Sequence, residues 1–331
     1  MTDCSHAESS NRARACTLSV VTSVYRSLPF LADFLAQMRE AIRQAGVHDY
    51  EIVFVNDGSP DESLSYLMSA RETDPRIRIV DLSRNFGHHK AALAGLSYAR
   101  GELVFIIDCD LEVSPGVLPR FIETMMSTSA DVVYGVQPTR KGGPLERLGG
   151  DLFWKIFNRL SDTHVPANVL TERLMTRDYV RSLLRLGDRN IFLAGMMYWT
   201  GFHQVGISVE KTRRNGASTY SLRRRISLLV EAITSFSTVP LKLVLGIGLT
   251  LTFCTMAFAL TILVRKILFP SSVLAGFTTL SLLVIGTSGV IITLMGILGL
   301  YISRIFVQTQ GRPAFIVRNF HGEECQNERE P

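Results

Sequence analysis

The sequence predicts an α/β protein with a largely parallel sheet, followed by two membrane-spanning helices. Three observations support this prediction. Strand and helix patterns alternate over about the first 140 residues, carboxylates follow two of the strands, and two long charge-free stretches lie near the end. Alternation of this kind is typical of βαβ units, whose strands run parallel. The length, 331 residues, suits one large domain with an appendage, or two domains.

The first part of the chain is expected to hold five strands and three helices. Strands are predicted from short β-branched or apolar runs, and helices from apolar residues at helical spacing. The strands are expected at 18–24, 51–55, 77–81, 103–107 and 132–134, and the helices at 28–45, 62–71 and 88–99. No G-x-G-x-x-G follows the first strand, which weighs against a dinucleotide-dependent dehydrogenase.

Two carboxylates, Asp108 and Asp110, stand one residue apart after the apolar run 102–107. At the carboxyl end of a buried strand they would face the crevice in which α/β sheets bind ligands. Such a pair repels unless a cation lies nearby. Mg²⁺ and Mn²⁺ take oxygen ligands and share them with substrate phosphates. The motif therefore predicts a clamp for a metal–diphosphate, although most chance D-x-D patterns are solvated turns.

The apolar residues are concentrated near the end of the chain. The range 243–264 contains no charge, and neither does 267–303. Each can supply the roughly 20 apolar residues that cross a bilayer, and buried core helices are the alternative reading. Transmembrane helices are predicted at 243–264 and 278–302. Lys and Arg cluster before the first and after the second, so the positive-inside rule predicts a hairpin in the inner (cytoplasmic) membrane with both termini cytoplasmic.

Other segments carry weaker signals. The polar range 1–15 lacks an apolar core and is expected to be a disordered tail. Amphipathic stretches at 152–160 and 223–235 are expected either to lie in the membrane surface or to pack on the sheet. The five cysteines show no metal-ligand spacing, which indicates reduced thiols. The net charge of +5 suits anionic lipid, and no nucleic-acid motif accompanies it.

Several motifs, in one order, together resemble a known family. They are Val-Asn-Asp-Gly-Ser at 55–59, Leu-Ser-Arg-Asn-Phe-Gly at 82–87, Asp-Cys-Asp-Leu at 108–111, Thr-Ser-Phe-Ser-Thr-Val-Pro-Leu at 234–241, Tyr-Ile-x-Arg-Ile at 301–305 and Arg-Pro at 312–313. The chain resembles the family-two glycosyltransferases with the A-type fold. Within them it is similar to polyprenyl-phosphate glycosyltransferases, which include dolichyl-phosphate mannose synthase and the bactoprenol glucosyltransferases. The resemblance runs from about residue 18 to residue 317.

The resemblance implies roles for particular residues. Asp57 would contact the nucleotide base or ribose, and Tyr25 would lie along the nucleotide. Asp108 and Asp110 would hold Mg²⁺ or Mn²⁺ and the diphosphate, with Asp110 counted among the catalytic residues. Arg214 matches a family arginine that meets the acceptor or leaving phosphate, and Arg173 matches another cation near the site. The alternative for both is a solvated surface charge. Neighbouring Val24, Cys109 and Glu112 complete the implied nucleotide-sugar site.

The chain also departs from the family pattern. Arg26-Ser27 stands where the family has Asn-Glu, and Glu112 stands where it has Gln. A family carboxylate expected at Thr171 appears instead at Glu172, and one step along a strand turns a side chain to the other face. Further departures are Val113, Thr219 and Leu300. No general base is therefore assigned from the resemblance.

The predicted organisation is a tail at 1–15, a cytoplasmic catalytic glycosyltransferase domain at 16–222, a juxtamembrane amphipathic helix at 223–242, the two spans, and a cytoplasmic tail at 303–331. The expected reaction moves a sugar from a nucleotide-diphosphate sugar to an undecaprenyl-type phosphate, with inversion, for cell-envelope glycan modification. The family suggests a homo-oligomer such as a tetramer. Three alternatives stay open: a processive polysaccharide synthase, a transferase acting on a glycan or protein, and an inactive scaffold. The Q-x-x-R-W motif that a processive synthase would carry does not occur in this chain.

Overall fold

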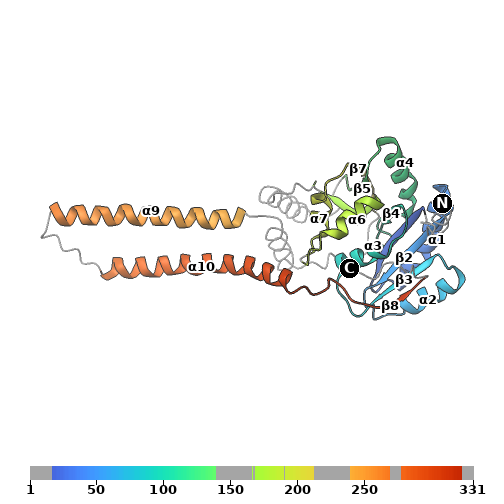
Figure 1. Ribbon diagram of the computed structural model, residues 1–331, viewed down its shortest axis with the longest axis horizontal. Helices are drawn as coiled ribbons and strands as arrows, with labels where there is room; N and C mark the ends of the chain where they lie inside the picture. Colours follow the sequence, from blue (N-terminus) through green and yellow to red (C-terminus); the bar gives the residue numbers. More distant parts are fainter. Residues whose placement is uncertain are drawn as a thin grey trace, which may run out of the picture. The chain divides into compact units, whose positions relative to one another are not determined.

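The computed structural model describes residues 17–138, 166, 168–189, 191–211, 239–268 and 277–322. These residues fall into two compact units, one built on a β-sheet and one on two long helices (Figure 1). The amphipathic stretches predicted at 152–160 and 223–235, and the tail at 1–15, lie outside the described residues. The predicted domain boundaries therefore stay predictions.

The first half of the sheet unit alternates strands and helices as the sequence predicts. Its central strands are buried along nearly their whole length, as expected for parallel strands covered on both faces. Pairing of β1 with β2, β1 with β4 and β2 with β3 is parallel. The elements are β1 (Leu18–Val24), α1 (Leu28–Gln44), β2 (Tyr50–Asn56), α2 (Ser63–Thr73), β3 (Ile77–Leu82), α3 (His88–Tyr98) and β4 (Leu103–Ile106).

The second half of the unit completes an eight-stranded sheet in the order β7-β5-β6-β4-β1-β2-β3-β8. Strand β6 lies between β4 and β5 and runs antiparallel to both of them. The C-terminal strand β8 pairs antiparallel with β3 at the edge (Figure 1). These elements are α4 (Leu118–Thr128), β5 (Val132–Val136), β6 (Val169–Thr176), α6 (Arg177–Arg185), α7 (Leu193–Trp199), β7 (Gln204–Ser208) and β8 (Val317–His321).

Helices cover both faces of the sheet. Buried residues of α1, α2 and α4 share one apolar core with the strands, where Phe34 and Phe121 pack edge-on against Phe54 and Phe105. Helix α3 contacts β1 and β2. A Cβ on Gly95 of α3 would lie 2.4 Å from a methyl group of Val21, so the absence of a side chain allows this close approach. The result is a rigid sheet whose strand ends position the site.

The second unit contains α9 (Val239–Leu268) and α10 (Phe277–Thr309), which run side by side (Figure 1). Both predicted spans, 243–264 and 278–302, fall within these helices. Among the described residues, one helical stretch, Val290–Thr309, is long and apolar enough to cross a membrane, and a shorter apolar stretch covers Leu241–Thr250. Two helices at the predicted places are confirmed, whereas a two-span hairpin stays a prediction.

Candidate active site

One buried carboxylate, that of Asp57 at the carboxyl end of β2, accepts hydrogen bonds from the loop that follows β3. Asp57 Oδ1 accepts the Phe86 N–H at 2.7 Å, and its Oδ2 accepts the Gly87 N–H at 2.9 Å. Burial raises the pKa of Asp57, and these two backbone hydrogen bonds partly oppose that rise. Asp57 therefore shapes the loop at the strand ends, and its predicted nucleotide contact remains a prediction.

Gly58 allows the same loop to pack closely. Its φ is +61°, a conformation that L side chains rarely adopt. A Cβ at this position would also lie 2.6 Å from both the Arg84 carbonyl carbon and the Asn85 nitrogen. Because these neighbours are backbone atoms, they cannot rotate out of the way. The glycine of the Asp57-Gly58 pair is thus required by the geometry.

The end of β1 lies beside β2 and presents an exposed tyrosine. The Val24 side chain is buried in the apolar core, and its carbonyl accepts the Asp57 N–H at 3.0 Å. Tyr25 follows with 44% of its surface exposed. Arg26 has a φ of +54°, and its N–H donates to Ser59 Oγ at 2.7 Å. Of the two predicted nucleotide contacts here, only Tyr25 offers an accessible side chain, and Val24 can offer backbone alone.

The Asp108-Cys109-Asp110 motif follows the end of β4 after one residue, Ile107, close to where the sequence predicts it. Burial raises the pKa of Asp108, and the neighbouring Asp110 raises it further, while His88 lowers it. Between them Cys109 is buried, and its Sγ donates to the Ser23 carbonyl at 3.3 Å. Burial raises the pKa of this thiol to about 11. The Cys109 side chain therefore belongs to the core, so its predicted place in the nucleotide-sugar site can involve only its backbone.

A left-handed residue shapes the turn after the motif. Leu111 has a φ of +58°, which costs an L residue about 1–2 kcal/mol. The turn lets the Glu112 N–H donate to Asp110 Oδ1 at 3.1 Å. The Glu112 carboxylate in turn accepts a hydrogen bond from Lys211 Nζ at 3.0 Å. Asp110, Glu112 and Lys211 are thus connected, and Lys211 is a residue that sequence reasoning did not place in the site.

His88 is a second residue that the sequence analysis missed. It begins α3, its Nδ1 lies 2.9 Å from Ser23 Oγ, and its Nε2 lies 3.7 Å from Asp108 Oδ1. The signal was present, because a Gly followed by two histidines opens the helix that comes five residues after the end of β3. The histidine links the ends of β1 and β4 beside the first aspartate.

Strand β6 brings two charged residues to β4. Since Ile106 of β4 pairs with Arg173, the adjacent Glu172 lies near the start of the Asp108 motif. Both side chains are about 99% buried, and alternation along the strand sends them to opposite faces. Burial, with the Asp108 and Asp110 carboxylates, raises the pKa of Glu172 to about 7, while Lys211 lowers it. The carboxylate at 172 therefore lies at the site, although it stands one position away from the family's.

Arg173 lies among aromatic rings. Its guanidinium carbon is 5.5 Å from the Tyr134 ring centre and 5.4 Å from that of Tyr198. Burial lowers its pKa, whereas the surrounding tyrosines and Glu172 act in the other direction. Its Nε and Nη1 have no hydrogen-bond partner among the described residues. The structure does not pair Arg173 with the two aspartates, and its predicted catalytic role stays a prediction. Arg214 lies outside the described residues.

The donor set at the β4 end suits a hard divalent ion in part. Asp108 and Asp110 supply carboxylate oxygens, the ligands that Mg²⁺ and Mn²⁺ prefer. Within the described residues no group of three or more His, Cys, Asp or Glu side chains is arranged to hold a metal. Two carboxylates alone leave most positions of an octahedral ion for water or phosphate oxygens. The residues fit an ion that is shared with a substrate.

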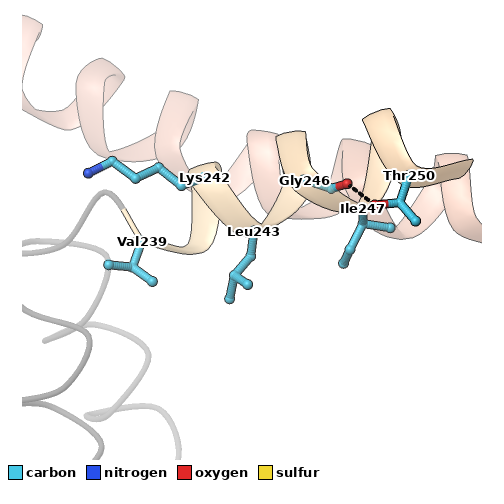
Figure 2. Close-up of a pocket in the computed structure, with 6 residues that line it drawn as sticks. All are labelled: Val239, Lys242, Leu243, Gly246, Ile247 and Thr250. Carbon is cyan, nitrogen blue, oxygen red and sulfur yellow. Dashed lines mark hydrogen bonds between the residues drawn. The ribbon is translucent and has the colours of Figure 1, made fainter. Parts of the chain in front are cut away.

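A hollow lies in the helical unit near the start of α9. It measures about 550 Å³ and is lined by Val239, Lys242, Leu243, Gly246, Ile247 and Thr250. Figure 2 shows the side chains of Val239, Leu243 and Ile247 on one side of the helix, while Lys242 extends toward its beginning. Thr250 Oγ1 donates to the Gly246 carbonyl at 2.8 Å, which satisfies its hydroxyl within the helix. The surface is apolar with one cation at its end.

The α/β fold and the strand-end aspartates agree with the glycosyltransferase that the sequence motifs predict. Residues 19–184, about half of the chain, match the family model described as Glycosyl transferase family 2. The chain belongs to this family, and the prediction of a glycosyltransferase is confirmed.

Curated relatives match nearly the whole chain. A protein of Mycobacterium tuberculosis (strain CDC 1551 / Oshkosh) whose name classes it among glycosyltransferases is 40% identical over 95% of this chain and 91% of its own length. The uncharacterized glycosyltransferase YkcC of Bacillus subtilis (strain 168) is 32% identical over 94% and 96%. The bactoprenol glucosyl transferase of Shigella phage SfX is 31% identical over 91% and 99%. The matches extend well beyond the family model and into the helical unit.

Proposed function

We propose that this enzyme transfers a sugar from a nucleotide-diphosphate sugar to a polyprenyl phosphate of the undecaprenyl type at the membrane. One observation carries the proposal: the bactoprenol glucosyl transferase of phage SfX matches 91% of this chain, too much to leave out both α9 and α10. A similarity restricted to the sheet unit would support sugar transfer alone. Its extension into long apolar helices supports an acceptor that resides in lipid.

The chemistry of the acceptor fits a site without an assigned general base. A phosphate monoester carries about −1.5 to −2 charge at neutral pH, so its oxygen is already a nucleophile. That oxygen attacks the anomeric carbon of the sugar, a new carbon–oxygen bond forms, and the bond to the nucleoside diphosphate breaks with inversion. The protein mainly has to bring two anionic phosphates together.

Specific residues take roles in this proposal. Asp108 and Asp110 would hold Mg²⁺ or Mn²⁺, which neutralises charge on the leaving diphosphate. Tyr25 would lie along the nucleotide, and Asp57 would orient its base or ribose directly or through the loop that it holds. Arg173, with two buried N–H groups lacking a hydrogen-bond partner among the described residues, suits an anion. The predicted phosphate contact of Arg214 belongs to the same proposal.

The membrane arrangement is also a proposal. Lys and Arg residues before α9 and after α10 favour a hairpin in the inner membrane with the catalytic domain cytoplasmic, where it would supply lipid-linked sugar for cell-envelope glycans. A cysteine placed at Ser272 should react with an impermeant thiol reagent in intact cells, whereas one at Ser10 should not. The reverse labelling would refute this orientation.

The function is tested by donor profiling. Purified full-length protein is incubated with undecaprenyl phosphate, Mg²⁺ and a panel of labelled UDP-, GDP- and dTDP-sugars. One donor should give labelled lipid that extracts into organic solvent, with an equal amount of nucleoside diphosphate. Release of nucleoside diphosphate with label only in a glycan or protein would instead support the transferase that acts on those acceptors.

A further inference from the structure

The segment that follows β7 places a lysine near the Asp108-Cys109-Asp110 motif, called the DxD motif below. The Val209 N–H donates to the Val136 carbonyl at 2.9 Å, so pairing with β5 continues one residue past β7. Val209 is itself buried. Lys211 follows two residues later, its side chain is 27% exposed, and its Nζ lies 3.0 Å from Glu112 Oε2. The backbone that carries this lysine is therefore anchored to the sheet, while its side chain stays accessible to a ligand.

A second carboxylate acts on Lys211 from β6. Glu172 is about 99% buried, and its Oε2 has no hydrogen-bond partner among the described residues. Burial lowers the pKa of Lys211, but the charges of Glu172 and Glu112 and the hydrogen bond to Glu112 outweigh it and raise the pKa. The ammonium group is thus hydrogen-bonded to Glu112 and also feels the charge of Glu172. An unsatisfied buried carboxylate in a native protein calls for an explanation.

The same ammonium lies close enough to the DxD motif to act on it. Its partner Glu112, 3.0 Å from Lys211 Nζ, also donates its backbone N–H to Asp110 Oδ1 at 3.1 Å, so the ammonium is one residue removed from the motif. Carboxyl groups at 108, 110, 112 and 172 gather at this end of the sheet, and each one that is ionised adds negative charge there. That charge would repel both a nucleotide diphosphate and a lipid phosphate. A cation fixed among the carboxylates is needed at the point where phosphates must approach.

We propose that Lys211 binds a substrate phosphate group, with Glu112 and Glu172 positioning its ammonium beside the DxD motif. The inference rests on the proposed function and deepens it. The phosphate belongs either to the donor diphosphate or to the acceptor monoester. An ammonium is a compact point charge with three donors and can bind phosphate oxygens while it keeps a carboxylate partner.

The test measures binding and does not depend on turnover. Calorimetry on the full-length protein in detergent with Mg²⁺ follows pyrophosphate as the donor probe and farnesyl phosphate as the acceptor probe. Lys211→Ala should weaken one of them about ten- to a hundredfold, and Lys211→Arg should weaken it less. Loss confined to pyrophosphate assigns the donor diphosphate, and loss confined to farnesyl phosphate assigns the acceptor.

Arg120→Ala is the matched control. Arg120 Nη1 donates to the Ser208 carbonyl at 2.9 Å, so this variant also removes one cation and loosens the same segment. It should leave both affinities near wild type. Equal losses in Arg120→Ala and Lys211→Ala would show that segment geometry, and not the ammonium, governs binding.

A double variant guards against misfolding. Lys211→Met leaves Glu172 without its cation, so it is combined with Glu172→Gln to remove both charges together. The double variant should keep the wild-type melting temperature within a few degrees and still lose phosphate binding. Wild-type phosphate binding in a folded double variant would overturn the proposal and leave Lys211 as a counter-ion. Absence of sugar transfer by the wild type would refute the proposed function without affecting these binding results.

Discussion

The sheet unit and the helical unit treat apolar residues in opposite ways. In the sheet unit, Phe34, Phe54 and Phe105 are completely buried, and carboxylates gather at the strand ends. In α9 and α10, large apolar side chains face outward: Phe253 is 77% exposed and Ile292 is 69% exposed. Exposed apolar surface costs about 25 cal/mol per Å² in water. The two units are therefore suited to different surroundings, the first to water and the second to lipid or to other apolar helices.

A few single apolar residues of the sheet unit are also exposed, but they do not change the difference between the two units. Met126 of α4 is 68% exposed and Trp199 of α7 is 62% exposed, but isolated residues of this kind are ordinary on soluble surfaces. The helical unit differs because the exposed residues continue along both helices. The comparison separates the unit that carries out the chemistry from the unit that would place it at the membrane.

The largest expected effect on activity comes from a substitution in the sheet unit. Asp110→Ala should lower the transfer rate by about two to three orders of magnitude, because diphosphate charge would no longer be balanced. Asp110→Asn, which keeps an acceptor for the Glu112 N–H, should lose as much if the charge is what matters. Both variants should stay folded and membrane-bound, and Asp33→Ala on the exposed face of α1 serves as the control. Full activity of Asp110→Ala, or of wild type in excess EDTA, would refute the proposal that Asp108 and Asp110 hold a divalent ion.

A pair of matched substitutions tests the contrast itself. Ile292→Arg on α10 and Met126→Arg on α4 place the same charge at positions of nearly equal exposure, 69% and 68%. An arginine at the centre of a membrane span costs about 2.5–3.5 kcal/mol, while an arginine on a wet surface costs little. Ile292→Arg should reduce the membrane-integrated fraction after alkaline extraction, and Met126→Arg should not. Identical behaviour of the two variants would mean that α10 does not face lipid.

A smaller effect is expected for the buried carboxylate of β6. The folded-state pKa of Glu172 is about 7 against an ordinary value of 4.5. A raised pKa contributes stability that is complete below pH 4.5 and is lost as the pH rises through 7. Glu172→Gln, which mimics the protonated acid, should therefore raise the melting temperature relative to wild type more at pH 8 than at pH 5.

That pH comparison is made in EDTA so that no divalent ion binds nearby. The exposed Glu123→Gln on α4 is the control for the loss of one carboxylate, and the pH dependence of Glu172→Gln is compared with it. Equal pH dependence of the two variants would show that the buried carboxylate is not destabilised by its surroundings.

The sequence was sufficient for much of the fold because its signals are local. β-Branched runs and helical spacing placed the five predicted strands and three predicted helices within a few residues of β1 to β5 and α1 to α3. The D-x-D pair was found because a run of apolar residues ends directly before it. The class of enzyme followed from motifs that stay contiguous in the chain.

The rest depended on pairing between distant segments. The antiparallel insertion of β6 beside β4 brings Glu172 to the Asp108 motif. No local pattern at 169–176 indicates that this segment pairs with β4. Lys211 reaches Glu112 across 99 positions of sequence. The return of β8 to β3 after two long helices is equally non-local. Sequence reasoning gave Arg173 as a cation near the site, a role that stays a prediction, and only the fold shows this arginine among tyrosines.

The most direct test of the central claim compares two acceptors that differ only in the phosphate. Wild-type protein in liposomes receives its labelled donor sugar with either undecaprenyl phosphate or undecaprenol. The account predicts labelled lipid from undecaprenyl phosphate and none from undecaprenol, because the alcohol lacks the ionised oxygen that attacks the sugar. Equal transfer to both lipids, or transfer to neither while a protein or glycan becomes labelled, would contradict it.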